Sequence, residues 1–336
     1  MLNIGGKMIR RLKWGVAGCG DFAERAIIPT LHLLPKSKLN SLYSSDINRA
    51  KFLAEKFGVQ NCFNDFDEFL KSDIDCVYIA SANLHHYEQV IKSARAGKNI
   101  LCEKPLAINS RQAEEMVRVC EENNVKFGVN YVYRFHPLVI KAKEIIDKGM
   151  LGKIVSITAN FNTDYAPNEN FRFNKSLSGG GALRDIGTHM LDLLTYFGGE
   201  ISSITGVTDN IIYKSEVDDF AAAIVKYQKS GYGFFNVSFN TKKAFNRVEI
   251  LGYNGAISIE HLIGRSSHPC KLTIDLSGEA GKAFRKRGAK LLFALRAFQK
   301  AFLTNKPLLV TGRDGLINLK LMEELEGKNA STQGTD

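Results

Sequence analysis

The stretch KWGVAGCGDFAERAIIPTL, Lys13–Leu31, places an apolar run, a glycine-rich turn and a helical pattern in immediate succession. Gly18, Gly20 and Ala23 give the spacing G-x-G-x-x-A between the expected strand and the expected helix. In such a turn, backbone N–H groups reach a pyrophosphate at the positive end of a helix, where larger side chains would block the approach. The same spacing occurs in ordinary turns, so the surrounding sequence decides between a dinucleotide site and a structural turn.

The surrounding sequence favours a dinucleotide. From Lys13 to Asn130, short apolar runs alternate with amphipathic stretches, which predicts βαβ units and a doubly wound parallel sheet. After Lys153, longer β-rich runs with turns such as KSGYG and YNGA predict a mostly antiparallel sheet, interrupted by one helix over GALRDIGTHMLDLLTYFGG. We therefore expect a doubly wound α/β domain over 1–130, an α+β domain over 131–326, and a disordered polar tail over 327–336.

Composition limits the class of protein. The 336 residues are 44% hydrophobic and 24% charged, as in ordinary globular chains with cores. No apolar run approaches the roughly 20 residues of a membrane span, and no apolar segment of signal-peptide length follows the basic N-terminus, so we expect a cytoplasmic protein that does not enter a membrane. The six cysteines form no C-x-x-C pair, and we expect neither disulfides nor a metal site.

The formal net charge of +10 is partly concentrated in KAFRKRGAKLLFALRAFQK. Because these basic residues lie beside an apolar helical stripe, we interpret them first as a solvated helix face. An anionic substrate is the alternative. Nucleic acid is disfavoured, since neither a helix-turn-helix pattern nor interleaved aromatic residues accompany the charge.

The segment LYSSDINRAK addresses the choice between NAD and NADP. If the strand ends at Ser44, a hydroxyl stands where NAD enzymes carry a carboxylate, and Arg49 could neutralise a 2′-phosphate, which favours NADP. If the strand ends later, Asp46 becomes the ligand of the ribose hydroxyls, which indicates NAD. The sequence favours NADP over NAD but leaves both open.

Two segments indicate chemistry. Glu103 and Lys104 end the strand NILCEK, and ligands of doubly wound folds lie at the carboxyl ends of the strands, where a lysine can hydrogen-bond a substrate oxygen. Asp185 and His189, four residues apart on one helix, could contact a sugar hydroxyl, with the imidazole accepting its proton. Asp192 could instead orient the ring of His189.

These motifs together resemble the glucose-fructose oxidoreductase and inositol dehydrogenase family, Gfo/Idh/MocA. The resemblance covers nearly the whole chain. It rests on five segments in family order: GVAGCGDFA, SANLHHYEQVIKSARAGKNILCEKPLA, NYVYRFHPLVIKAKEIIDKGMLGKIVSI, SGGGALRDIGTHMLDLL and NKPLLVTGRDGLINLKLMEE. It implies a Rossmann domain followed by an open sheet that forms the substrate face and commonly an interface between subunits, so we expect a homodimer or homotetramer.

The resemblance also implies the roles of individual residues. The catalytic lysine falls on Lys104, and the Asp-x-x-x-His pair falls on Asp185 and His189. The implied cofactor-binding residues are Gly18, Cys19, Gly20, Asp21, Phe22, Ser44, Ser45, Asp46, Arg49, Ser81, Asn83, His86, Glu103, Lys104 and Asn130. Ser44 and Arg49 fit the spacing that contacts a 2′-phosphate, whereas Ser45 departs from the arginine that many NADP-binding relatives carry there.

We therefore expect an NAD(P)-dependent oxidoreductase that acts on a secondary alcohol of a sugar, a polyol or a sugar derivative, or on the matching ketone. Candidate substrate residues are Tyr165, Phe171 and Arg172 in the loop TDYAPNENFRFNKSLS, together with Tyr133 and Arg134, for which packing is an equal alternative. Two other functions remain: a nucleotide-sensing regulator without catalysis, and a hydrolase that uses tightly bound NAD transiently. The basic excess is compatible with an anionic sugar.

Overall fold

The computed structural model describes residues 10–264, 268–304 and 306–332. The chain divides into two compact units. Unit 1 comprises residues 1–106, 114–130 and 291–312, and unit 2 comprises residues 107–113, 131–290 and 313–336. The sequence placed one boundary after Asn130 and did not anticipate that residues 291–312 return to unit 1.

Unit 1 contains a six-stranded sheet in the order β3-β2-β1-β4-β5-β6, and every neighbouring pair is parallel. This is the strand order of a Rossmann domain. The strands are β1 (Leu12–Ala17), β2 (Ser37–Tyr43), β3 (Asn61–Phe63), β4 (Cys76–Ile79), β5 (Asn99–Cys102) and β6 (Phe127–Val129). The crossover segments are η1 (Ala23–Ile27), α1 (Ile28–His32), α2 (Ile47–Phe57), α3 (Phe66–Lys71), α4 (Asn83–Arg95) and α5 (Ser110–Glu122).

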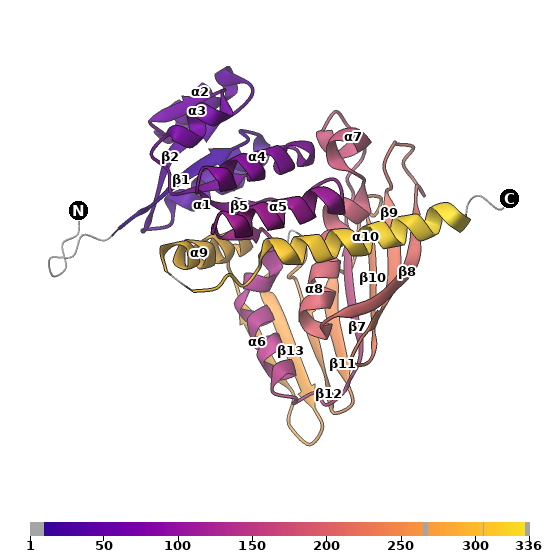
Figure 1. Ribbon diagram of the computed structural model, residues 1–336. Helices are drawn as coiled ribbons and strands as arrows, with labels where there is room; N and C mark the ends of the chain where they lie inside the picture. The colour runs from indigo at the N-terminus through magenta and orange to yellow at the C-terminus, as the bar shows by residue number, and fades with distance from the viewer. Residues whose placement is uncertain (1–9, 265–267, 305, 333–336) are drawn as a thin grey trace, which may run out of the picture. The chain divides into compact units, whose positions relative to one another are not determined.

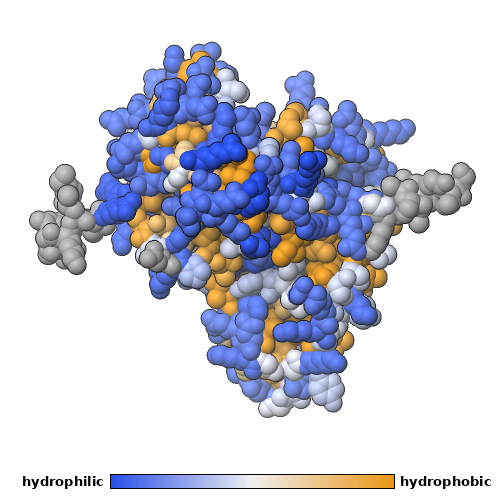
Figure 2. Space-filling view, viewed as in Figure 1, coloured by the Kyte–Doolittle hydropathy of each residue, from blue (hydrophilic) through white to orange (hydrophobic). Residues whose placement is uncertain are grey.

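The parallel sheet and its crossover helices confirm the predicted fold class (Figure 1). The sequence missed β3 and α3, because a strand of three residues and a helix of six carry too little periodicity to be recognised. Hydrophilic side chains cover much of the surface over the helices of unit 1 (Figure 2), as expected for helices that turn one apolar face to a sheet.

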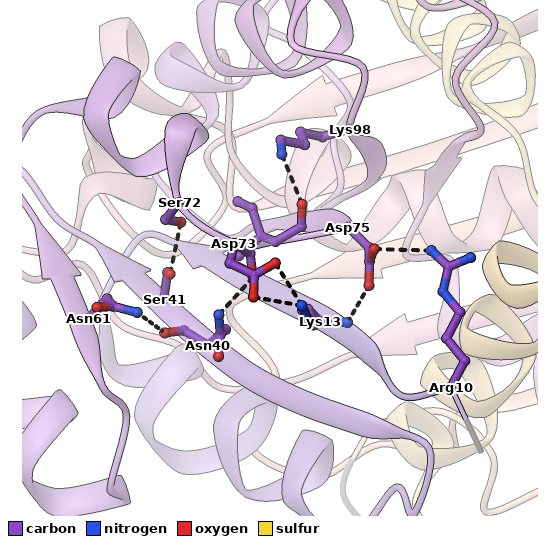
Figure 3. Close-up of polar contacts among 10 residues, drawn as sticks. Arg10, Lys13, Asn40, Ser41, Asn61, Ser72, Asp73, Asp75 and Lys98 are labelled. Carbon is purple, nitrogen blue, oxygen red and sulfur yellow. Dashed lines mark hydrogen bonds and ion pairs between the residues drawn. The ribbon is translucent and has the colours of Figure 1, made fainter. Parts of the chain in front are cut away.

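A polar network joins the amino ends of the strands in unit 1 (Figure 3). The Nζ atom of Lys13, on β1, donates to both carboxylate oxygens of Asp73, at 2.7 and 2.6 Å, and its backbone N–H donates to Asp75 at 2.8 Å. Arg10 adds an ion pair to Asp75 at 3.1 Å. Ligands of this fold bind at the opposite, carboxyl ends of the strands, so this network serves the register of β1 and β4.

The helix α9 (Lys290–Leu303) belongs to unit 1 from Leu291 onward. The indole of the buried Trp14 donates to the Ser37 hydroxyl at 2.9 Å, and Gln299 of α9 donates to the same oxygen at 2.6 Å. Phe298 packs so closely on Gly128 that a Cβ there would lie 2.3 Å from its ring. These contacts explain why the apolar stripe of the basic segment forms a helix.

The ammonium group of Lys126 closes the end of α9. Its Nζ atom donates to the carbonyl oxygens of Ala301, Thr304 and Lys306, the first at 2.5 Å and the last at 3.0 Å. A cation at a helix C-terminus satisfies orphan carbonyls and complements the helix dipole. The sequence did not indicate this role for Lys126.

Unit 2 contains an eight-stranded sheet in the order β14-β13-β12-β11-β7-β10-β9-β8. All neighbouring pairs are antiparallel except β7 and β10, which confirms the expected mostly antiparallel sheet. The strands are β7 (Ile154–Asn162), β8 (Ile201–Asp209), β9 (Phe220–Tyr227), β10 (Tyr232–Ser238), β11 (Arg247–Gly252), β12 (Gly255–Glu260), β13 (Cys270–Leu276) and β14 (Lys282–Lys286). The edge strand β14 was expected within the basic helical segment, but KAFRK pairs with β13 instead.

Helices cover one face of this sheet. In Figure 1, α6 (Pro137–Asp147) and α8 (Thr188–Gly198) lie over its strands, where α8 packs on β7 and β10 and α6 packs on β12 to β14. Shorter segments of unit 2 are η2 (Val132–Phe135), η3 (Phe171–Phe173), α7 (Lys175–Ser178) and η4 (Leu183–Gly187). Ile157, Val237 and Ile250 are buried on the covered face, whereas Val207, Ile224 and Phe234 stay exposed on the other.

The last helix, α10, spans Gly312–Thr332. The sequence expected a tail without regular structure from residue 327, and the helix corrects this for residues 327–332. Buried Leu319, Met322 and Leu325 anchor α10, so the polar residues after them continue a helix that is already formed. Residues 333–336 lie outside the described residues. No helix in the described part of the chain is long and apolar enough to cross a membrane.

Candidate active site

The glycine turn follows β1 directly. Gly18 has φ +100°, and a Cβ on it would lie 2.5 Å from the backbone nitrogen of Ser81, so the turn requires glycine here for both conformation and close packing. A Cβ on Gly20, in contrast, would meet nothing within 4 Å. Gly18 therefore shapes the turn, while Gly20 leaves open space over the backbone at the start of η1, where a phosphate could approach.

Arg49 connects α2 to the glycine turn. Its Nε atom donates to the carbonyl oxygen of Cys19 at 2.8 Å, and its guanidinium forms an ion pair with Glu24 of η1. Asp46 caps α2, because its carboxylate accepts the backbone N–H of Asn48 at 2.9 Å. Since β2 ends at Tyr43, the residue just after the strand is Ser44, and Asp46 already serves the helix.

The other residues expected at the turn differ in exposure. Asp21 and Phe22 are exposed, and Ser45 is exposed beside Ser44. Cys19 is buried, and burial raises the pKa of its thiol to about 12, so the side chain packs as a small apolar group. The backbone of Cys19, rather than its sulfur, faces the functional part of the turn through the contact with Arg49.

Three strands bring their carboxyl ends together around Glu103. Its Oε1 atom accepts the Tyr78 hydroxyl at 2.5 Å and the Nδ2 amide of Asn130 at 2.7 Å. Asn130 also donates to the Tyr78 oxygen at 2.8 Å, so its Nδ2 side is fully used. Burial and then the charge of Glu103 raise the pKa of Tyr78, which stays a neutral donor. The sequence missed Tyr78 because it lies inside the apolar run of β4.

The side-chain oxygen of Asn130 is suited to accept a hydrogen bond from a ligand. Its Oδ1 atom is buried and has no hydrogen-bond partner among the described residues. A buried carbonyl oxygen without a donor is costly, so the arrangement favours an N–H group arriving from outside the described residues. The position at the carboxyl end of β6 is where this fold binds its ligands.

His86 of α4 lies beneath the segment that carries Lys104. Its ring has no exposed surface, and its two nitrogens contact the carbonyl oxygens of Ser81 and Pro105, both at 3.1 Å. Burial lowers its pKa to about 4. His86 thus joins two loops at the carboxyl edge of the sheet, and none of its ring surface is open to a cofactor. Lys104, in contrast, is partly exposed. Ser81 is further fixed by donating to Gln89 at 2.7 Å, and Asn83 is buried at the start of α4.

In unit 2, Asp218 holds the start of the helix that carries Asp185 and His189. Its carboxylate accepts the backbone N–H groups of Gly181 and Leu183, both at 2.8 Å. A Cβ on Gly181 would lie 2.0 Å from the carbonyl oxygen of Asp218, so only glycine fits there. The sequence missed this cap because more than thirty residues separate the two partners.

Asp185 lies in the π-helical turn η4, and His189 lies in α8. Single π-turns inside helices recur at functional sites, because they change the direction in which side chains project. Asp185 forms an ion pair with Arg172 of η3 at 3.4 Å. The structure thus brings together two residues that the sequence singled out separately.

His189 is 8% exposed and stands against two aromatic rings. Tyr133 meets it edge-on with ring centroids 5.0 Å apart, and Tyr131 does so at 6.1 Å. The hydroxyl of Tyr133 accepts the backbone N–H of Gly264 at 3.2 Å, and burial raises its pKa to about 12. The two tyrosines pack edge-on against the imidazole and restrict its rotation.

Arg134 is buried in ion pairs. Its guanidinium contacts Asp192 of α8 at 2.7 Å and Asp314 of α10 at 2.9 Å. Burial raises the pKa of Asp192, and the Arg134 guanidinium works against that rise. These contacts favour a packing role for Arg134 over substrate binding, and they show that Asp192 pairs with Arg134.

The other candidate substrate residues also pack on aromatic or cationic neighbours. Tyr165 packs on Phe173 and Phe239, at 5.1 and 5.6 Å, and Phe171 lies under the guanidinium of Arg172.

The residues fit a dinucleotide. The open backbone at Gly20, the glycine-dependent turn at Gly18 and the unpartnered oxygen of Asn130 all lie at the carboxyl ends of a parallel sheet in Rossmann order. No cluster of three His, Cys, Asp or Glu side chains that could hold a metal ion occurs within the described ranges. Unit 1 therefore defines the class: an NAD-binding Rossmann protein.

Comparison with protein families agrees with this class. A model described as "Oxidoreductase family, NAD-binding Rossmann fold" matches residues 12–131, and one described as "GFO/IDH/MocA C-terminal domain" matches residues 139–258. Together these matches cover both halves of the fold. The chain belongs to the GFO/IDH/MocA oxidoreductase family.

Individual relatives are similar over most of their length. Oxidoreductase P35 of Formosa agariphila is 28% identical over 75% of this chain and 80% of its own. The 1,5-anhydro-D-fructose reductase of Ensifer adhaerens is 27% identical over 91% of this chain and 93% of its own. A solved structure of levoglucosan dehydrogenase with NADH and levoglucosan has a TM-score of 0.87 at 23% identity, covering 96% of this chain and 98% of that one.

Proposed function

We propose that this protein transfers a hydride between a nicotinamide dinucleotide and a secondary alcohol, or the matching ketone, of a sugar, a polyol or a sugar derivative. The proposal rests chiefly on the open backbone at Gly20 and the unpartnered Asn130 oxygen. The names of relatives that act on anhydro-sugars support the substrate class. When bound, the nicotinamide supplies hydride acceptance or donation at carbon.

We assign the other roles in the reaction to individual side chains. His189 is the base that accepts the hydroxyl proton, because two aromatic rings pack edge-on against its imidazole and hold its nitrogens in a fixed direction. Lys104 donates a hydrogen bond to the reacting oxygen. Asp185, already oriented by Arg172, positions a neighbouring hydroxyl of the substrate. Tyr78 and Glu103 fix the amide of Asn130, so that its oxygen can receive the cofactor.

The direct test is turnover. We expect His189→Ala and Lys104→Ala each to lower kcat about 100-fold or more in a dehydrogenase assay on a sugar panel, while the Kd of the dinucleotide changes less than threefold for His189→Ala. Asp67→Asn, a surface change on α3, is the matched control. Unchanged turnover in both variants would refute the assignment. Reduced cofactor that never accumulates would indicate a nucleotide sensor, and NAD retained through purification without net reduction would indicate a hydrolase.

We further propose that NADP is preferred over NAD. Asp46 is committed to capping α2, Ser44 presents a hydroxyl just after β2, and Arg49 lies against the turn. A 2′-phosphate would compete with Glu24 for the Arg49 guanidinium. We expect Arg49→Gln to raise the Kd of NADPH at least tenfold and that of NADH less than threefold. Equal changes for both cofactors would contradict the preference.

We also propose that copies of the chain associate through the uncovered face of the eight-stranded sheet. Ile224 and Phe234 lie opposite each other on β9 and β10 and are 50% and 38% exposed, and Leu251 on β11 is 48% exposed. Exposed apolar residues thus lie on one face of β9, β10 and β11, with β7 between the last two strands, and such exposed apolar surface is typical of an interface. We expect Ile224→Lys with Phe234→Lys to convert the assembly to monomers in light scattering, and an unchanged mass would count against this surface.

A further inference from the structure

A pocket in unit 2 is surrounded by imidazole and cationic side chains. It is lined by His136, His261, His268, Lys286, Arg287 and Lys290, and we call it the basic pocket. These residues come from the position before α6, the loop after β12, the end of β14 and the start of α9. Its volume is ≈ 190 Å³. A cavity of roughly 150 Å³ accommodates benzene, so the basic pocket suits a small ligand rather than a polymer.

The charge of the basic pocket is one-sided. Lys286, Arg287 and Lys290 contribute positive charge, and no carboxylate is among the described residues that line it. The pKa of His136, which also lines the basic pocket, is lowered to about 4 by burial and by the positive charges of Lys290 and Lys286. Like charges gathered in a confined space raise the local concentration of an anion.

Two of the lining groups are held in place. The Nζ atom of Lys290 donates to the carbonyl oxygens of Leu262 at 2.6 Å and Gly264 at 2.8 Å, which uses two of its three N–H bonds and fixes the ammonium group. His136 is 2% exposed, and its Nδ1 atom accepts the N–H of Leu138 at 3.2 Å. The ring proton of neutral His136 is therefore on Nε2, which is a donor.

We propose that the basic pocket binds a phosphate group, either as inorganic phosphate or as part of a small phosphorylated metabolite. A guanidinium fork and ammonium groups match the several oxygens and double charge of phosphate better than a monovalent carboxylate. Lys290 also lies 5.1 Å from the ring of Tyr133, whose other neighbour is His189. The ring of Tyr133 therefore lies next to both Lys290 and His189, and His189 itself does not line the basic pocket.

The test is calorimetric titration of the full chain with inorganic phosphate at constant ionic strength. We expect Lys286→Gln with Arg287→Gln to raise the Kd at least tenfold. Lys282→Gln is the matched control, because it lies on the same strand, pairs with Glu279 and does not line the basic pocket. It removes the charge of one lysine, and we expect less than a twofold change. Both variants alter exposed residues, and unchanged melting temperatures verify the fold.

A second titration distinguishes the two sources of phosphate. Tighter binding of glucose 6-phosphate than of inorganic phosphate, lost in the double variant, indicates a phosphorylated metabolite, and the reverse order with the same loss indicates free phosphate. The proposal is overturned if the double variant binds phosphate like the unaltered chain, if Lys282→Gln loses as much, if acetate binds equally well, or if binding requires an added metal ion. None of these readouts needs hydride transfer, so failure of the proposed function would leave the result intact.

Discussion

Replacement of Asp218 tests how the helix of Asp185 and His189 is held. Its carboxylate accepts two buried N–H groups, and Asp218→Ala leaves both donors without acceptors. Burial raises the pKa of Asp218, so the variant also recovers part of the cost of burying that carboxylate. Each unsatisfied donor costs about 1–3 kcal/mol, and with this recovery we expect a net loss of about 3 kcal/mol in the free energy of unfolding.

The assay combines urea unfolding with amide hydrogen exchange. We expect the amides of Gly181 and Leu183 to lose protection, kcat to fall because His189 is no longer fixed, and the Kd of the dinucleotide to stay unchanged, since unit 1 keeps its glycine turn. The control is Asp65→Ala, which removes a single exposed cap bond at 2.8 Å and costs about 1 kcal/mol. If Asp218→Ala is no more destabilising than Asp65→Ala, or if both amides stay protected, the reasoning is refuted.

Three further predictions concern unit 1. Gly18→Ala prevents folding or destabilises by about 3 kcal/mol or more, because of the positive φ and the close backbone, whereas Gly20→Ala keeps its melting temperature and loses dinucleotide affinity; similar melting temperatures for the two would contradict this. Burial lowers the pKa of His86 from 6.5 to about 4, so the unfolded chain binds the proton more tightly, and stability falls by up to about 3 kcal/mol as the pH drops from 6.5 to 4. In urea midpoints, His86→Asn should flatten that dependence relative to the unaltered chain, and a profile identical to that of the unaltered chain would exclude His86 as the cause. Phe298→Ala costs about 4 kcal/mol in denaturant unfolding, because its ring is 1% exposed, and a cost under about 1 kcal/mol would show that α9 contributes little to unit 1.

Local patterns in the sequence predicted the helices and strands of the fold, but they carried no information about contacts between distant residues. The alternation of apolar runs and helices was enough for the parallel sheet, because each βαβ unit is built from neighbouring residues. The return of α9 to unit 1 depends on Gln299 and Ser37, which are 262 positions apart. No periodicity within a window of sequence carries that information.

The candidate site shows the same difference between short local motifs and contacts from distant residues. The glycine turn and the Asp-x-x-x-His helix are short motifs and could be found, but the residues that hold them are remote or inconspicuous. Tyr78 looks like one more apolar residue of a buried strand, and Asp218 looks like a turn residue before β9. For Arg134 the sequence left packing and substrate binding equal, and only the pairing with Asp192 and Asp314 distinguishes them.

The covering of Trp14 by α9 has a consequence during synthesis. Ring contacts join Trp14 to Phe302, with centroids 5.8 Å apart, so β1 keeps an apolar surface uncovered until nearly three hundred residues after it have been translated. A fragment ending at residue 130 would carry the complete glycine turn and all six strands, yet would present the bare flank around Gly128 to water. The nucleotide-binding half is therefore a poor candidate for separate expression, and we expect nascent chains that end before α9 to bind chaperones.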